Sequence, residues 1–75
     1  MSAGQWTELF ARKLGTAPPS EEEQSRLLAL AGTAAHASER TAAPISCWLA
    51  ARAGVEPAEA GRLAQELADE LEARS

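Results

Sequence analysis

The chain has 75 residues and a formal net charge of −4, and this length predicts a single domain, residues 1–75, with a modest core. The acidic balance argues against nucleic acid, whose phosphates attract a basic surface, and against an anionic membrane. A single cysteine fits a reducing compartment, and no apolar run approaches the roughly 20 residues of a membrane span, so we expect a cytoplasmic protein.

The first predicted helix covers residues 5–14. Trp6, Leu9 and Phe10 recur at helical spacing and share one face. Gly15 follows the last turn, where glycine often adopts the left-handed conformation that ends a helix. The next segment, TAPPS, contains a double proline that cannot continue a helix, and it predicts an extended connector.

The second predicted helix covers residues 20–38. Ser20 and Glu23 have the spacing of a capping box, in which each side chain bonds the backbone N–H of the other residue. Leucine and alanine then recur at helical spacing. This pattern predicts a buried stripe formed by Leu27, Leu30, Ala31 and Ala34 and widened by Leu28 and Ala35.

The third predicted helix covers residues 43–53. Thr41 is a candidate N-cap, and Pro44 falls in the first turn, where proline is tolerated. Gly54 predicts the end of this helix. The apolar face of the helix consists of Ile45, Trp48 and Leu49.

The fourth predicted helix covers residues 57–73 and begins with Pro57. Its opposite face is mostly charged, and Glu59 and Arg62 have the spacing of a helical ion pair. Its apolar face is the most regular in the chain and consists of Ala60, Leu63, Ala64, Leu67, Ala68 and Leu71.

These four helical patterns and their short connections predict an all-α fold, a compact bundle of four short helices. No segment alternates with period two over a useful length, so strands are not expected. Alanine allows helix axes to approach closely. We expect Trp6, Phe10 and Trp48 to fill the remaining volume of the interior.

Residues 36–48 contain most of the chemically unusual side chains. His36 lies near a predicted helix end, where a protonated imidazole suits the dipole or a neutral ring bonds a carbonyl. We expect Arg40 to bind Glu39 or a carbonyl of this helix end and thereby hold the turn. An anion site at the start of the third predicted helix is the alternative for Arg40.

Cys47 follows Pro44 near a predicted helix N-terminus, where a thiolate is favoured. It also lies between Ile45 and Trp48, as a small, partly buried apolar side chain would. We expect the structural role, with a Cys47–His36 dyad across the turn as the catalytic alternative. One histidine beside one cysteine does not complete a four-ligand zinc site, so neither a metal nor a cofactor is expected.

Two segments, QWTELFARKLG and RLLALAGTAAHASERTAAPISCWLAARAG, carry a family resemblance. They resemble a family of small, uncharacterised all-helical domains of high-GC bacteria. The matching residues are Trp6, Leu14, Gly15, Ala35, His36, Glu39, Arg40, Ala42, Ala43 and Pro44. Members occur alone or fused behind molybdenum cofactor guanylyltransferase-like nucleotidyltransferase domains, which implies an accessory role near molybdenum cofactor maturation. The chain departs from the family pattern at Thr41, where proline is expected, and at Trp48, where a smaller aromatic residue is usual.

The leading functional hypothesis is a non-enzymatic helical accessory or interaction domain. It would dock a helix face, or the surface around residues 36–48, onto a partner protein or onto a second copy of itself. The resemblance implies a nucleotidyltransferase as the partner class. The candidate surface consists of His36, Glu39, Arg40, Pro44, Cys47 and Trp48.

Two other functions are alternatives to this hypothesis. One is a small-ligand-binding or catalytic site, which would require four side chains to converge on one pocket: His36, Glu39, Arg40 and Cys47. The other is a helix-turn-helix reader of DNA, which the acidic charge disfavours.

Overall fold

The computed structural model describes residues 1–74 and contains four α-helices. Their bounds are Ala3–Leu14 (α1), Glu21–Ala37 (α2), Ala42–Arg52 (α3) and Pro57–Arg74 (α4). The predicted all-α fold of four short helices is confirmed, and no strand occurs within these residues. Each predicted helix end lies within two residues of the observed end. Ser75, the last residue of the predicted domain, lies outside the described part.

Local sequence signals set most helix ends. The predicted capping box at Ser20 is present: the Glu23 backbone N–H donates to Ser20 Oγ at 3.1 Å, and the Ser20 N–H donates to Glu23 Oε1 at 2.8 Å. Ser2 and Gln5 form the same arrangement at the start of α1. This second box explains why α1 begins at Ala3, two residues before the predicted start.

Glycines end α1 and α3 as predicted. Gly15 and Gly54 have φ angles of 78° and 72°, in the left-handed region that glycine adopts without strain. Behind them, the N–H groups of Thr16 and Val55 donate to carbonyls of the last helical turn. Thr41 occupies the N-cap position of α3 as predicted, but its side chain makes no capping hydrogen bond.

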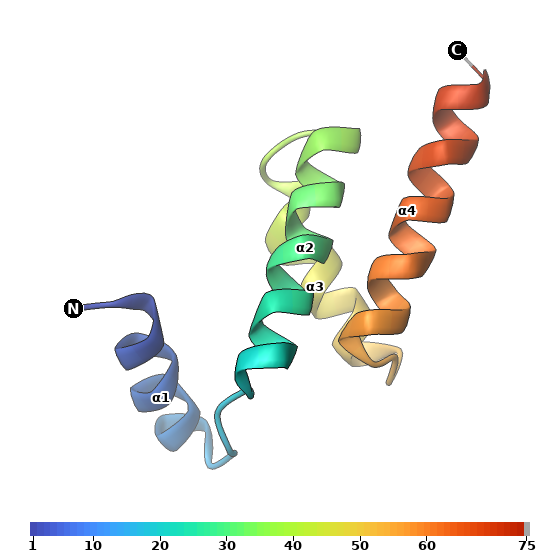
Figure 1. The fold of residues 1–75 in the computed structure, drawn as a ribbon. Coiled ribbons are helices and arrows are strands. Elements are labelled where there is room, and N and C mark those ends of the chain that lie inside the picture. The colour runs from blue at the N-terminus through green and yellow to red at the C-terminus, as the bar shows by residue number, and fades with distance from the viewer. Residues whose placement is uncertain (75) are drawn as a thin grey trace.

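The helices run in alternating directions along the chain, and they are unequally packed (Figure 1). α2 lies against both α3 and α4, whereas α1 makes no comparable contact within residues 1–74. The molecule measures 43 × 25 × 18 Å, and its radius of gyration is 13.4 Å. A spherical domain of this length would have a radius of gyration of about 11 Å. The compact part of the fold is therefore α2, α3 and α4, with α1 beside it.

Small side chains form the contacts between the helices. Within residues 1–74, the buried side chains are Ala11, Leu30 and Ala60. Of the predicted stripe on α2, Leu30 is buried, but Leu28 is 71% exposed, so its assignment to this stripe is wrong.

The expectation that both tryptophans and Phe10 fill the interior is also wrong. Trp6 and Trp48 are 59% and 58% exposed, and half of Phe10 is exposed. Alanines of α2, α3 and α4 occupy half-buried positions between the helices, while the aromatic rings lie on the outer sides of α1 and α3.

Candidate functional site

The predicted site residues around the turn lie mostly in water. His36, Glu39, Arg40 and Pro44 are all exposed. Backbone hydrogen bonds hold the turn: the Ala42 N–H donates to the Glu39 carbonyl at 3.0 Å, and the Ala43 N–H donates to the Arg40 carbonyl at 3.1 Å. These backbone bonds close the chain reversal between α2 and α3, and Ser38 Oγ donates to the Ala34 carbonyl at 3.1 Å at the end of α2.

The side chains of this turn do not form the predicted Glu39–Arg40 contact. Glu39 Oε1 instead accepts a hydrogen bond of 3.3 Å from Thr41 Oγ1. Within residues 1–74, the Arg40 guanidinium makes no hydrogen bond or ion pair. The expectation that Arg40 holds the turn is therefore wrong, and its charge is open to solvent.

Cys47 lies on the inner side of α3, half-buried against α2. Its Sγ donates a long hydrogen bond of 3.9 Å to the carbonyl of Leu27. Burial raises the pKa of the Cys47 thiol, so the thiolate expected near a helix N-terminus is disfavoured. The structural role expected for Cys47 agrees with this position.

The Cys47–His36 dyad is not assembled. The Cys47 thiol lies at the level of Leu27, and His36 follows Leu27 by nine residues on α2. Nine residues correspond to about 13 Å along a helix and to half a turn around it. The four side chains of the ligand-binding or catalytic alternative therefore do not converge on one pocket.

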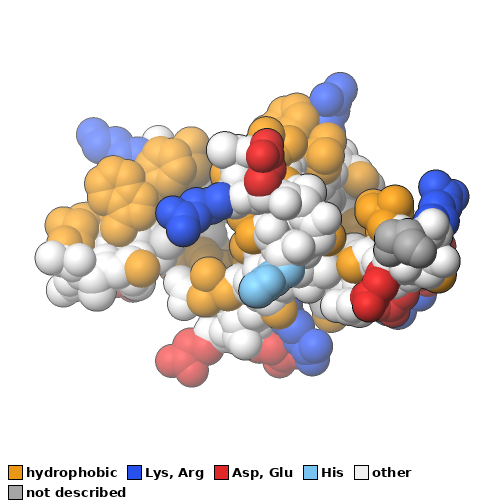
Figure 2. Space-filling model, turned by 90° about the horizontal axis from the view of Figure 1, so that it is seen from above, with side chains coloured by type: hydrophobic (Ala, Val, Ile, Leu, Met, Phe, Trp, Pro, Cys, Tyr) orange, Lys and Arg blue, Asp and Glu red, His pale blue; other side chains and the backbone are white. Residues whose placement is uncertain are grey.

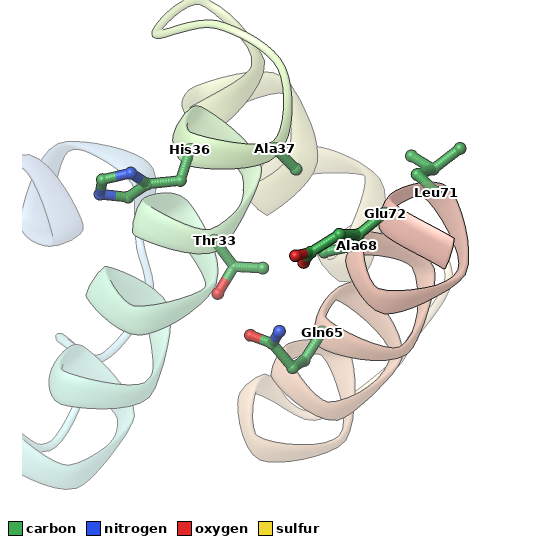
Figure 3. A pocket seen from close by; sticks show the side chains of 7 residues that line it. All are labelled: Thr33, His36, Ala37, Gln65, Ala68, Leu71 and Glu72. Atoms are coloured by element: carbon green, nitrogen blue, oxygen red, sulfur yellow. The ribbon is translucent and has the colours of Figure 1, made fainter. Parts of the chain in front are cut away.

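A groove of about 580 Å³ runs between α2 and α4 near the turn. Figure 3 shows Thr33 and Glu72 pointing into the space between the helices, while the ring of His36 points away from α4. Gln65 Nε2, on the α4 side, donates to Asp69 Oδ1 at 3.0 Å. Within residues 1–74, no three histidine, cysteine, aspartate or glutamate side chains are placed to hold a metal ion.

The outer side of α3 presents an apolar surface, here called the α3 face. It consists of Ile45, Trp48, Leu49 and Arg52. The first three side chains are each more than half exposed, and the Arg52 guanidinium lies 5.0 Å from the Trp48 ring centre. This distance allows a cation–π interaction. Of the predicted candidate surface, Trp48 belongs to this face and Cys47 lies on the side opposite to it.

A second apolar surface, here called the α1 face, lies on the outer side of α1. It consists of Trp6, Leu9, Phe10 and Lys13. The rings of Trp6 and Phe10 stack with centres 6.1 Å apart and planes inclined by 19°. Figure 2 shows the hydrophobic side chains gathered at this end of the molecule. The helical spacing of these residues is visible in the sequence, but their exposure could not be predicted from it.

The solvent-accessible surface of the molecule is large for its mass, in agreement with these exposed apolar faces. Its accessible surface is 5964 Å² for a chain of 7.9 kDa. A folded monomer of this mass exposes about 4,400 Å² on average. The chain therefore exposes roughly 1,500 Å² more than an average monomer, and its exposed large apolar side chains contribute to this excess.

The comparisons with known proteins identify a family. A family model described as a domain of unknown function (DUF6457) matches residues 1–75, so the chain belongs to this family. No curated protein and no solved structure matches the chain. Within residues 1–74, none of the helices is both long and apolar enough to cross a membrane.

Proposed function

We propose that the domain is a non-enzymatic accessory domain that docks its α3 face onto a partner protein in the cytoplasm. The observation that carries this proposal is the orientation of α3. Its small residues, such as Ala43, Cys47 and Ala50, are half-buried. Its large apolar residues are exposed on the other side of the helix.

The composition of the α3 face suits protein recognition better than small-molecule chemistry. Tryptophan and arginine are the residues that most often dominate binding energy at protein interfaces. Trp48 and Arg52 are already in contact, so binding a partner costs less side-chain entropy at these two residues. Nothing on this face can act as a nucleophile or a general base.

The family resemblance supplies the class of partner. It implies domains of high-GC bacteria that occur alone or fused behind molybdenum cofactor guanylyltransferase-like nucleotidyltransferases. We therefore propose such a nucleotidyltransferase as the protein that covers the α3 face. Pro44, which belongs to the predicted candidate surface, is exposed one helical turn before Trp48 and would lie at the edge of the contact. Arg40, from the same predicted surface, is exposed in the turn before α3.

Isothermal titration calorimetry with a purified nucleotidyltransferase of this class, taken from the same organism, tests the proposal. We expect Trp48→Glu to weaken binding more than about tenfold, because it places a charge at the centre of the apolar contact. Leu28→Glu is the matched control, since Leu28 is at least as exposed as Trp48 (71% against 58%) but lies on α2. Failure of the wild-type chain to bind, or equal weakening by both substitutions, would overturn the proposal.

A further inference from the structure

We propose that copies of this chain associate head to tail, with the α1 face of one copy packed onto α4 of the next. This inference goes beyond the proposed function and uses neither the α3 face nor the partner assigned to it. Its two elements are the α1 face and a leucine row on α4, here called the α4 face. The α4 face consists of Leu63, Leu67 and Leu71, with Glu66 and Glu70 beside them.

The α1 face points away from its own chain. The contacts of α1 with α2 are slight: Ala11 is buried, and Gln24 Nε2 donates to Thr7 Oγ1 at the long distance of 3.5 Å. Ala11 follows Trp6 by five residues, which places the two side chains about 140° apart around the helix. The stacked pair of Trp6 and Phe10 therefore lies on the side that α2 does not cover.

The α4 face is only partly covered by its own chain. Alanines on one side of the leucine row, such as Ala60 and Ala64, pack toward the other helices. The three leucines are 42–54% exposed, although two of them also line a small hollow of about 160 Å³ shared by α2, α3 and α4. A large apolar surface laid along this row would complete their burial.

The charges of α1 and α4 are complementary. α1 carries Arg12 and Lys13 against the single acidic residue Glu8. α4 carries five acidic residues against two basic ones. Glu66 and Glu70 lie on the outer side of its leucine row, and Arg62 Nη1 donates to Glu66 Oε2 at 3.0 Å within the same helix. Opposite charges at the edges of an apolar contact favour the correct pairing and disfavour α1 against α1 or α4 against α4.

One chain holds both halves of this contact but keeps them apart. α1 and α4 lie at opposite sides of the molecule, with α2 and α3 between them (Figure 1), and hydrophobic side chains are visible at both of these ends in Figure 2. A contact between two different surfaces on opposite sides of a molecule is head to tail, so the α1 face of each copy meets the α4 face of the next copy. The complementarity within one sequence selects a second copy as the occupant.

The exposed area is sufficient for this pairing. A standard protein interface buries about 800 Å² on each partner. The excess of roughly 1,500 Å² on this chain is larger than the area that one such contact buries on each copy.

Sedimentation equilibrium of the full chain and its variants tests the pairing. We expect the wild-type mass to rise with concentration from the chain mass of 7.9 kDa to twice that mass and beyond. Phe10→Glu is expected to give a monomer, because it places a charge within the α1 face. Trp48→Glu, a matched change outside the two pairing faces, is expected to associate as the wild-type chain does.

A charge exchange tests which helices meet. One chain carries Arg12→Glu and Lys13→Glu, and a second chain carries Glu66→Lys and Glu70→Lys. Each chain alone is expected to be monomeric, because its pairing faces then have charges of the same sign. An equimolar mixture is expected to associate, because both contacts regain opposite charges, and this recovery also shows that the variants are folded.

Three results would overturn the pairing: a wild-type monomer at every concentration, a mixture that does not associate, or charge-reversed chains that each still associate on their own. Binding of Phe10→Glu to the nucleotidyltransferase is measured in parallel. Retained binding by a monomeric variant separates the two proposals, since the α3 face is unchanged in it. Loss of nucleotidyltransferase binding alone would contradict the proposed function and leave the pairing intact.

Discussion

α1 and α2 begin in the same way and have different surroundings. Both start at a serine capping box, with Ser2 and Gln5 in α1 and Ser20 and Glu23 in α2. α2 contacts α3 and α4, and it contributes Leu30, the one large buried side chain within residues 1–74. α1 buries only an alanine and exposes its aromatic pair.

This difference separates two roles of an amphipathic helix. Capping and periodicity determine whether a helix forms, whereas the surface that covers its apolar side determines what the helix does. α2 is covered within its own chain and therefore supports the fold. The α1 face and the α3 face are uncovered, and we interpret them as surfaces for other protein molecules.

The largest effect on the free energy of unfolding is expected when the buried side chain of α2, Leu30, is truncated. Leu30 is 3% exposed, and Leu30→Ala is expected to cost about 2–5 kcal/mol, which approaches the whole stability of a small domain. Leu28→Ala changes the same residue type on the same helix but in solvent, and it should cost less than about 0.5 kcal/mol. Urea unfolding followed by circular dichroism measures both. Equal losses of unfolding free energy in the two variants would contradict the packing described for α2.

The two serine caps give the next largest effect and compare α1 with α2 directly. Ser20→Ala is expected to lower the free energy of global unfolding by about 1 kcal/mol, because α2 belongs to the cooperative core. Ser2→Ala loses an equivalent bond, but this change should appear as fraying of α1 with little change in global unfolding. Nuclear magnetic resonance chemical shifts report the fraying, and urea unfolding reports the global change. An equal global loss from Ser2→Ala would show that α1 is part of the same cooperative unit.

The inner side of α3 provides a smaller test. Burial raises the pKa of Cys47, so the folded state keeps the proton. The resulting stability is present below the ordinary thiol pKa of 9.0 and is lost as the pH rises through the higher folded value. We therefore expect iodoacetamide to modify Cys47 more slowly at pH 8 in the folded chain than in urea. Equal rates would contradict the packing of this thiol against Leu27.

The smallest effect is expected on the solvent side of α4. A hydrogen bond from Arg62 Nε at 2.7 Å, together with the positive charge of Arg62, lowers the pKa of Glu59 below its ordinary value of 4.5. The associated stability is present above pH 4.5 and is lost as the pH falls through the lower folded value. NMR titration should show the Glu59 pKa rise to its ordinary value in Arg62→Gln. An unchanged pKa in that variant would show that the pair is not formed in solution.

The sequence predicts the parts of this fold that depend on neighbouring residues. Ser20, Gly15 and Gly54 act within a few residues of their own position, and each performs its predicted role. The position of Trp6 and Trp48 depends on which helix lies opposite them, and helical periodicity carries no information about that neighbour.

In the candidate site, too, features set by neighbouring residues are predictable, and features set by helix packing are not. The structural role expected for Cys47 follows from its apolar neighbours Ile45 and Trp48, and the thiol is indeed half-buried. The separation of Cys47 from His36 follows from the level at which α3 crosses α2, and no local pattern encodes it. The α1 face was missed as a surface because its regular spacing is also typical of a core.

Hydrogen exchange of the wild-type chain, followed by mass spectrometry at low and high protein concentration, tests the central claim most directly. The claim is that the α1 face is buried by another copy of the chain and not by the other helices of its own chain. At low concentration, the amides of α1 should exchange almost as fast as in an unfolded peptide, while those around Leu30 stay protected. At high concentration, protection should appear in α1 and increase along α4. Protection of α1 equal to that of α2 at every concentration would contradict the claim.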